Sequence, residues 1–438
     1  MVRYCIALEK EGIPTVAIVG PGFMTISRTI GKFEGIPELR VAGRVIFGSE
    51  RFAWETFSHE ELAEELVNAL ARPVVASAGT AQSGGALQED LLSFTGDGIG
   101  QVIEAIDKEF YKRHWTDGLP IIPPTEERLR WMLRGTDLPP DHLVGILEPQ
   151  KGLATVRTIA INAVMAGARP EHFPVILSLA STGVPALFTS TTSFARMVVV
   201  NGPIRNELKM NAGIGALGPF NQANSVIGRA WTIMSMNLAA AGKIGETYMG
   251  SQGNNYSYNN LCMPENEEEL PPGWNPFHVQ KGHKPQESVV STFNGWGFTH
   301  PDQSFGKPFH TQIPFWLKFV SPFSPVTLLL DPTIIKQLKE REGFDSKEQL
   351  IDWIYKNTSV TVQDFLNDFY SVQNFILPNA RRGVEPFASR IKLPKDAKIP
   401  QFASPAVINI LSVGGGTNLF WQAGDFGYVS SASVDKWR

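Results

Sequence analysis

The sequence has little that ties it to a membrane, a nucleic acid or an oxidising compartment. Only two cysteines occur in 438 residues, so no disulfide framework is indicated and a cytoplasmic location is expected. No run of about 18 uninterrupted apolar residues is present, which argues against a membrane span. Glu9 and Lys10 interrupt any apolar segment near the start, so no signal peptide is expected. The net charge of −4, without a long basic run, argues against nucleic acid as a partner.

Motifs for several common catalytic chemistries are also missing. The eight histidines show neither His-x-x-x-His nor His-Glu-x-x-His spacing, and no Gly-x-Ser-x-Gly elbow is present. Gly20-Pro21-Gly22 follows an apolar run, but Thr25 stands where a dinucleotide-binding turn needs its third glycine. We therefore interpret this stretch as a tight strand-to-helix turn. The sequence assigns no residue to a cofactor.

A second glycine run, "SVGGGTN", covers residues 412–418 and follows a predicted strand. It lacks the Lys-Ser/Thr pair of a phosphate-binding P-loop, which argues against ATP hydrolysis. The run is interpreted as a glycine hairpin or a close-packed turn, and an anion site formed by backbone N–H groups is the alternative.

What the chain does contain is typical of a globular protein. It has 43% hydrophobic and 19% charged residues, and its length suffices for two or three domains. Helix and strand patterns alternate near the N-terminus, as in α/β proteins. We predict a truncated Rossmann-like or flavodoxin-like α/β domain over residues 1–75, a small-residue linker over 76–98, and a large α+β domain with long ordered loops over 99–438.

The periodicity and capping patterns predict individual elements. Helices are expected over 2–11, 59–70 (with Ser58 as its N-cap), 99–113, from Thr125 onward, 153–167, 171–183, 222–240, 332–341, 346–356 and 361–372. Strands are expected over 15–19, 43–47, 197–200, 325–330 and 406–413, and long ordered loops over 245–315. Because the chain starts on a helix where a strand normally comes first, the first domain is expected to lack an edge strand, unless a partner chain supplies it.

Acidic residues, an imidazole and a thiol occur within one short stretch in the middle of the chain. Cys262 as a nucleophilic thiolate needs a nearby base, for which His278 is the candidate, and a buried inert cysteine is the alternative. His278 and His283 also follow closely after Glu265 and Glu267. A carboxylate–imidazole site for acid–base chemistry or for a metal is therefore a second interpretation.

Asparagines gather around glycine turns in the same part of the chain, and an arginine lies on an otherwise apolar helix. Asparagine favours turns and caps, which accounts for part of this pattern. The density still predicts a polar pocket for an oxygen-bearing ligand, or a subunit contact. The predicted substrate-binding residues are Asn162, Asn201, Asn211, Asn224 and Arg229.

Longer motifs extend over about two thirds of the chain. They are "LEKEGIPTVAIVGPGF", "DGLPIIPPT", "INAVMAGARPEHFPVI", "VVVNGPIRNELKMNAGIGALGP", "NSVIGRA" and "CMPENEEE". Through the first motif, residues 1–75 resemble the C-terminal part of the selenocysteine-motif domain of the UGSC family and of the selenoprotein B subunits of glycine reductase-type complexes. Through the others, residues 111–300 resemble the large domain that is often fused behind it.

The resemblance implies the large subunit of a heteromeric reductase, in which a thiol or selenol acts on a small polar substrate at a C–N or C–S bond. The family's redox motif (Sec or Cys, Gly, Ser or Thr, Cys) is absent from the sequence, and Cys5 lies in the helix that follows its place. We therefore expect a small companion chain that carries the motif, or a loss of thiol chemistry.

Two other readings remain open at the level of the sequence. The first is a lyase or hydrolase-type enzyme with its own site around Glu265, His278 and Cys262, with or without a metal. The second is a non-catalytic scaffold subunit. In each reading a homo- or hetero-oligomer is expected.

Overall fold

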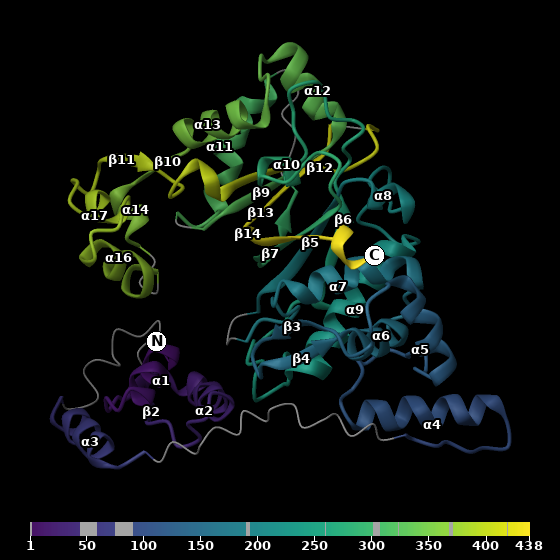
Figure 1. Cartoon of the computed structure of the whole chain (residues 1–438). Coiled ribbons are helices and arrows are strands. Elements are labelled where there is room, and N and C mark those ends of the chain that lie inside the picture. Colours follow the sequence, from purple (N-terminus) through teal and green to yellow (C-terminus); the bar gives the residue numbers. More distant parts are fainter. Residues whose placement is uncertain are drawn as a thin grey trace. The chain divides into compact units, whose positions relative to one another are not determined.

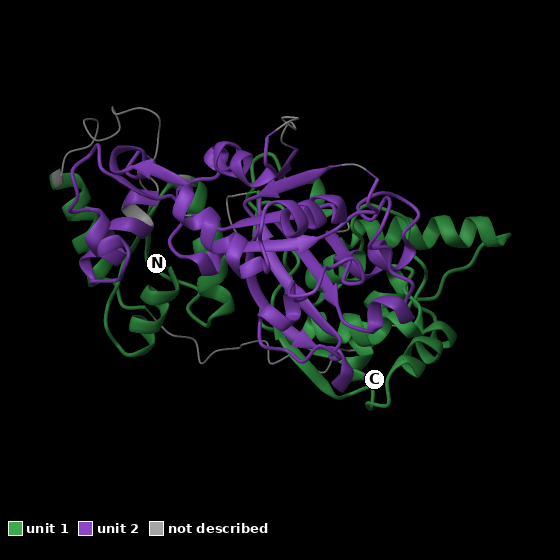
Figure 2. Ribbon diagram, turned by 90° about the horizontal axis from the view of Figure 1, so that it is seen from above, with its two compact units in different colours: residues 1–194, 229–259, 437 green, residues 195–228, 260–436, 438 purple. Residues whose placement is uncertain are grey.

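The computed structural model describes residues 2–43, 59–74, 91–189, 193–258, 260–300, 307–322, 324–367, 371–417 and 419–438. In these residues the protein is mixed α/β, with small sheets (Figure 1). The chain forms two compact units, which Figure 2 distinguishes by colour. Unit 1 comprises residues 1–194, 229–259 and 437, and unit 2 comprises 195–228, 260–436 and 438. The domain boundaries expected from the sequence stay a prediction.

Unit 1 begins with a helix that a β-α-β arrangement follows. It contains α1 (Val2–Lys10), β1 (Ala17–Val19), α2 (Met24–Phe33) and β2 (Val41–Gly43), and its two strands are parallel. The Gly20-Pro21-Gly22 turn leads into α2, with the Phe23 N–H donating to the Gly20 carbonyl over 2.8 Å. The interpretation as a strand-to-helix turn is therefore confirmed. A Rossmann-like or flavodoxin-like layout of this part stays a prediction.

The rest of unit 1 is mainly helical. Its elements are α3 (His59–Ala71), α4 (Ile99–Lys112), α5 (Glu126–Met132), the antiparallel strands β3 (Leu143–Leu147) and β4 (Gly152–Thr155), α6 (Val156–Met165), α7 (Phe173–Ser181) and most of α9 (Gln222–Ala239). Most agree with the predicted helices. The helix expected over 153–167 is wrong at its start, because residues 152–155 pair with β3 and Thr155 caps α6 through its side chain.

Unit 2 holds two four-stranded mixed sheets. Its strands are β5 (Ala195–Asn201), β6 (Leu261–Pro264), β7 (Val289–Gly295), β8 (Phe298–Thr299), β9 (Val326–Leu330), β10 (Ser359–Thr361), β11 (Lys398–Pro400), β12 (Ile408–Ser412), β13 (Trp421–Gly424) and β14 (Gly427–Ser433). One sheet has the order β14-β7-β5-β6, with β5 and β6 parallel. The other has the order β12-β9-β13-β8, with β12 and β9 parallel.

Unit 2 also contains eight described α-helices besides the start of α9. They are α8 (Ile204–Glu207), α10 (Phe277–Gln280), α11 (Ile313–Trp316), α12 (Pro332–Arg341), α13 (Lys347–Asn357), α14 (Val362–Phe365), α16 (Leu377–Arg381) and α17 (Phe387–Arg390). One core of unit 2 joins α12 and α13 to β9 and β12 through Leu328, Leu330, Ile335, Leu350 and Ile410, all without exposed surface. Such a dry contact is the main stabilising term of an α/β layer.

Two further predictions need correction, and three lie wholly or mostly outside the described residues. The long loops expected over 245–315 contain β6, α10, β7 and β8, because residues such as those of Val289–Gly295, nearly all of them buried, fill a sheet between β5 and β14. In place of one helix over 361–372, α14 ends at Phe365 and a π-helix begins at Val372. The strand over 43–47, the cap at Ser58 and most of the linker over 76–98 lie outside the described residues. In the described part of the chain, no helix is long and apolar enough to cross a membrane.

Candidate functional site at the strand ends of unit 2

The ends of three strands bring polar side chains together in unit 2. Because β5 and β6 are parallel neighbours, their carboxyl ends meet at one edge of the sheet, where Asn201 ends β5 and Glu265 follows β6. The Asn266 N–H donates to the Ser412 carbonyl at the end of β12, over 2.8 Å. Ligands of open α/β sheets commonly bind at this edge. The group called here the strand-end cluster consists of Asn201, Arg205, Glu265, Glu267, His278, Lys347 and Ser412.

Glu265 is the buried centre of this cluster. Its Oε1 accepts hydrogen bonds from Lys347 Nζ (2.6 Å) and the Ser412 N–H (3.3 Å). Its Oε2 accepts from Asn201 Nδ2 (2.8 Å) and the Phe277 N–H (2.6 Å). Glu265 and Lys347 have no exposed side-chain surface. Since both oxygens are occupied from four directions, Glu265 holds the surrounding elements in place and has no free position for a substrate.

Glu267 differs because one of its oxygens is free. Oε1 accepts from Asn201 Nδ2 and the Gly202 N–H, both over 2.8 Å, and lies 3.1 Å from Arg205 Nε. Oε2 has no partner among the described residues, and the side chain is 13% exposed. Gly202 has φ +81°, and a Cβ there would lie 2.2 Å from the Glu287 carbonyl oxygen. The "NGP" turn after β5 thus needs its glycine to bring this N–H to Glu267.

Arg205 fixes the loop that carries Glu265 and Glu267. Its Nη1 donates to the Glu265 carbonyl over 2.8 Å, and its two terminal nitrogens pair with Glu268 at 3.0–3.1 Å. The hydrogen bond from Arg205 holds the pKa of Glu268 at about 2, well below its ordinary value. This fork geometry is the one in which arginine orients carboxylates best.

His278 is the unusual member of the cluster. It lies on α10 without exposed surface, and neither ring nitrogen has a hydrogen-bond partner. Its Nδ1 lies 3.9 Å from Glu267 Oε1. Asn201 Oδ1 and Ser412 Oγ are also buried without partners. Because buried polar groups in native proteins are nearly always paired, four unpaired atoms in one cluster indicate a place for a bound molecule.

The charges of the cluster indicate what kind of molecule fits. The two carboxylates of the cluster (Glu265 and Glu267) face two cations (Arg205 and Lys347), and the adjacent Glu268, which pairs with Arg205, adds one negative charge. Most of the free positions are acceptors: a carboxylate oxygen, an amide oxygen and one imidazole nitrogen. A hydrogen-bond donor with a positive charge therefore complements the cluster.

Cys262 lacks the properties of a nucleophile. It is a free, buried cysteine on β6, opposite Val198 of β5. Burial raises the pKa of its thiol to about 12, although a backbone hydrogen bond from Gly228 works against this. The group is therefore a neutral thiol at physiological pH, and attack requires the thiolate. The geometry favours the alternative of an inert buried cysteine.

The predicted substrate-binding asparagines make different contacts. Asn201 belongs to the strand-end cluster. Asn211 accepts from the Gly213 N–H (2.9 Å) and Asn224 donates to the Asn211 carbonyl (3.2 Å), so both close the turn after α8. Asn162 lies in unit 1, where its Oδ1 accepts from Asn237 over 2.7 Å.

Arg229 is also committed to a structural contact in unit 1. It pairs with Asp117 through two hydrogen bonds of 2.8 and 2.9 Å and donates to the Pro120 carbonyl over 2.8 Å. It thereby anchors the "DGLPIIPP" segment to α9. Its role in substrate binding stays a prediction.

Over its described residues 412–417 the glycine run is a close-packed turn, and the alternative of a hairpin is wrong. β12 and β13 do not pair; both flank β9, so the run crosses the end of β9. The Gly416 N–H donates to Asp331 Oδ2 over 3.1 Å.

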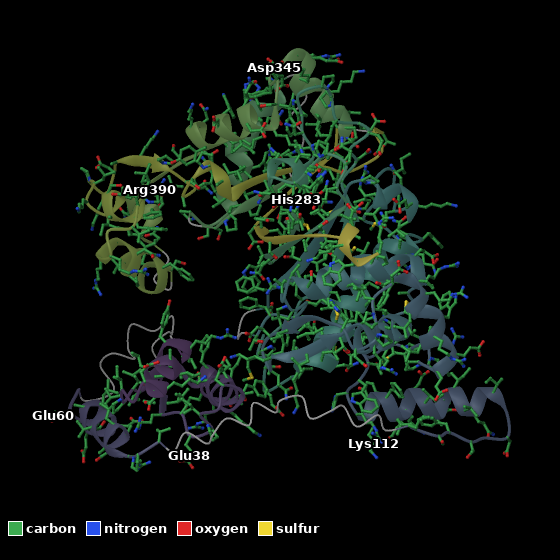
Figure 3. The ribbon with its side chains drawn as sticks, in the orientation of Figure 1. Glu38, Glu60, Lys112, His283, Asp345 and Arg390 are labelled. Atoms are coloured by element: carbon green, nitrogen blue, oxygen red, sulfur yellow. The ribbon has the colours of Figure 1, made fainter. Side chains whose placement is uncertain are left out.

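Across the described ranges, no group of three His, Cys, Asp or Glu residues is arranged to hold a metal ion. His283, which the sequence predicted to lie near Glu265 and Glu267, pairs with Glu287 over 3.2 Å; it is labelled in Figure 3.

Comparison with protein-family models, with curated proteins and with solved structures finds no match. Arg205 and Lys347 are members of the cluster that the sequence did not predict as site residues. The "NGPIRNE" motif, with an arginine one helical turn after Gly202, was a signal for Arg205, but nothing near Lys347 indicates a contact with Glu265.

Proposed function

We propose that the chain is an enzyme that binds a small amine-bearing substrate at the strand-end cluster and transfers a proton through His278. The observation that carries this proposal is a fully buried imidazole without hydrogen bonds, beside a carboxylate with one free oxygen. Catalytic hydrogen bonds are often long before the substrate binds, so the 3.9 Å separation suits an acid–base pair.

Each residue then has a defined task. Glu267 Oε2 and Asn201 Oδ1 accept hydrogen bonds from the ammonium group, and the neutral imidazole of His278 takes a proton from the substrate or returns it. Asn201 Nδ2 and Arg205 are positioning groups, since they hold Glu267 through its other oxygen. The negative charge of Glu268, beside a cluster whose own charges balance, attracts the amine. The reaction class that fits is lyase or hydrolase-type chemistry at a C–N bond.

Isothermal titration calorimetry tests this site with methylammonium chloride as the probe and potassium chloride as the salt control. We expect saturable binding to the full chain, with an affinity at least tenfold lower in Glu267→Gln. His283→Gln and Glu287→Gln are matched controls, because they change a partly exposed His–Glu pair of the same unit. Equal binding by all variants, or no saturable binding by the unmodified chain, would overturn the proposal.

A second candidate function is the large subunit of a heteromeric thiol or selenol reductase, as the resemblance to the UGSC family implies. The parallel β1–β2 pair with α1 and α2 favours it, since this is the α/β organisation expected for residues 1–75. In this function two thiols of a companion chain provide two electrons and two protons to a C–N or C–S bond and become a disulfide.

Purification from the native source with its neighbouring gene products tests this second function. A stoichiometric small chain with a Cys-Gly-Ser-Cys or selenocysteine motif, and activity lost on alkylation, are the expected results. An active preparation that contains this chain alone would contradict it, while leaving the acid–base site intact.

A further inference from the structure

Helix α4 of unit 1 keeps most of its apolar side chains in contact with water. These side chains recur at the spacing of one helical face, which is called here the α4 stripe. The stripe consists of Ile99, Val102, Ile103, Ile106 and Phe110. Only Phe110 is buried, whereas Ile99 is 77% and Ile103 is 45% exposed. In Figure 1 most of α4 lies apart from the other helices of unit 1.

The contacts that hold α4 to unit 1 lie in its C-terminal half. Phe110 packs edge to face on Trp115, with 5.3 Å between the ring centres, and Asp107 Oδ1 accepts from the Ile121 N–H over 3.4 Å. None of the described helices and strands packs along the length of α4. The helix has 14 residues, and an isolated helix of about that length is only marginally stable in water. A partner that covers the stripe therefore stabilises it.

The charges at the two ends of α4 indicate which partner fits. The exposed Asp97 lies just before the helix, where its N–H donates to Gln101 Oε1 over 2.9 Å. At the other end, Lys112 (labelled in Figure 3) and Arg113 outnumber the one carboxylate there, Glu109. A second α4 in antiparallel order brings the acidic end of each helix to the basic end of the other, whereas a parallel order places like charges together.

The apolar stripe is complementary to itself in the same antiparallel order. A pair of helices with Ile99 opposite Phe110 aligns the two stripes over their full length. The same register sets Asp97 opposite Lys112, because both pairs of residues are centred on the same point of the helix. A two-fold dimer needs such a self-complementary surface, and it is the commonest form of symmetric assembly.

We propose that the α4 stripe is a self-association surface, through which two copies of this chain form an antiparallel helix pair. A helix of this length extends about 21 Å. The contact is therefore smaller than the roughly 1,600 Å² of a standard protein interface, and we expect a dimer with a Kd in the micromolar range. The surface shares no residue with the strand-end cluster and is independent of the function proposed for it.

Sedimentation velocity of the full chain over a micromolar concentration range tests this surface. We expect a monomer–dimer equilibrium whose Kd rises about tenfold in Ile103→Glu, since an unpaired carboxylate then lies in the middle of both stripes. Val67→Glu is the matched control and keeps the Kd of the unmodified chain, because Val67 is an exposed residue (64%) of another helix, α3. A monomer at every concentration, or a dimer that Ile103→Glu leaves unchanged, would overturn the proposal.

Charge reversal tests the antiparallel order without a change in the apolar stripe. Asp97→Lys and Lys112→Glu each place like charges together at both ends of the helix pair, so we expect each to raise Kd about fivefold. The double variant Asp97→Lys/Lys112→Glu restores opposite charges and should recover the Kd of the unmodified chain. An unchanged Kd in both single variants, or no recovery in the double variant, would overturn the antiparallel pair.

Discussion

Two His–Glu pairs of unit 2 have the same composition and opposite geometry. In the pair of His310 and Glu342, Nδ1 lies 2.7 Å from the carboxylate, which also accepts from the N–H groups of Phe309 and His310 and from Gln337. In the pair of His278 and Glu267, the distance is 3.9 Å and the imidazole has no hydrogen bond.

The difference separates a structural contact from a candidate site. Glu342 follows the last residue of α12 as its C-cap, and its carboxylate caps the turn Phe309–Gln312. Every partner of this carboxylate is therefore a residue of the protein itself. The imidazole of His278 is more deeply buried than that of His310, yet its hydrogen-bonding capacity is unused. A buried polar group without a partner destabilises the folded state, so its presence is best explained by a bound molecule.

The largest expected effect comes from the buried Lys347–Glu265 pair, which holds the strand-end cluster in place. Lys347→Met leaves the Glu265 charge buried without its partner, and we expect a loss of about 3–5 kcal/mol in the free energy of unfolding. Urea denaturation measures it. Lys336→Met, which removes an exposed contact of 4.0 Å with Glu340, is the control and is expected to change stability by less than about 0.5 kcal/mol. Equal losses in the free energy of unfolding for the two variants would show that the buried Lys347–Glu265 pair does not hold the cluster in place.

The two histidines are expected to differ in stability. His310→Gln loses the bond to Glu342 and part of an aromatic contact with Trp353, so the free energy of unfolding falls by about 1–2 kcal/mol. His278→Gln has no hydrogen bond to lose, and we expect a change below about 1 kcal/mol, together with loss of proton transfer. A larger loss in the free energy of unfolding for His278→Gln than for His310→Gln would contradict the view that His310 makes the structural contact and His278 does not.

The smallest effect concerns pH. Burial works to raise the pKa of Glu342, but the hydrogen bonds from Gln337 and from the Phe309 and His310 N–H groups lower it, and the Arg205 contact holds the pKa of Glu268 at about 2. Both folded-state values lie below the unfolded ones, so the stabilisation is complete above about pH 4.5 and is lost as the pH falls toward 2.

Glu342→Gln and Glu268→Gln should therefore flatten this acid-side decline in the free energy of unfolding, measured by urea denaturation at successive pH values. Glu340→Gln, an exposed change on the same helix, should leave the decline as it is. An unchanged slope in the first two variants would contradict the assigned contacts.

The sequence was most informative where a signal is local. The cap at Thr125 lies within a few residues of the N–H that it binds, and the helix predicted from Thr125 was confirmed. The stretch after β6 indicated that Glu265, Glu267 and His278 belong near one another, because strand ends and short loops limit how far they separate. Contacts such as Lys347–Glu265 and Arg229–Asp117 join distant segments, and single-residue patterns carry no signal for them.

The roles within the cluster could not be predicted either, since they depend on the number of partners. Glu265 and Glu267 look alike in "PENEEE", but the first has both oxygens occupied and the second has one free. Cys262 looked reactive beside acids and an imidazole, and its burial on β6 makes it a neutral thiol.

NMR of the imidazole nitrogens tests the central claim most directly. Long-range ¹H–¹⁵N spectra of the full chain are recorded during a titration with methylammonium chloride, with His278→Gln and His283→Gln used to assign the signals. We predict that the His278 nitrogens shift saturably while those of His283 and His310 stay in place. Unchanged His278 signals, or equal shifts at all three histidines, would contradict an amine site at the strand-end cluster.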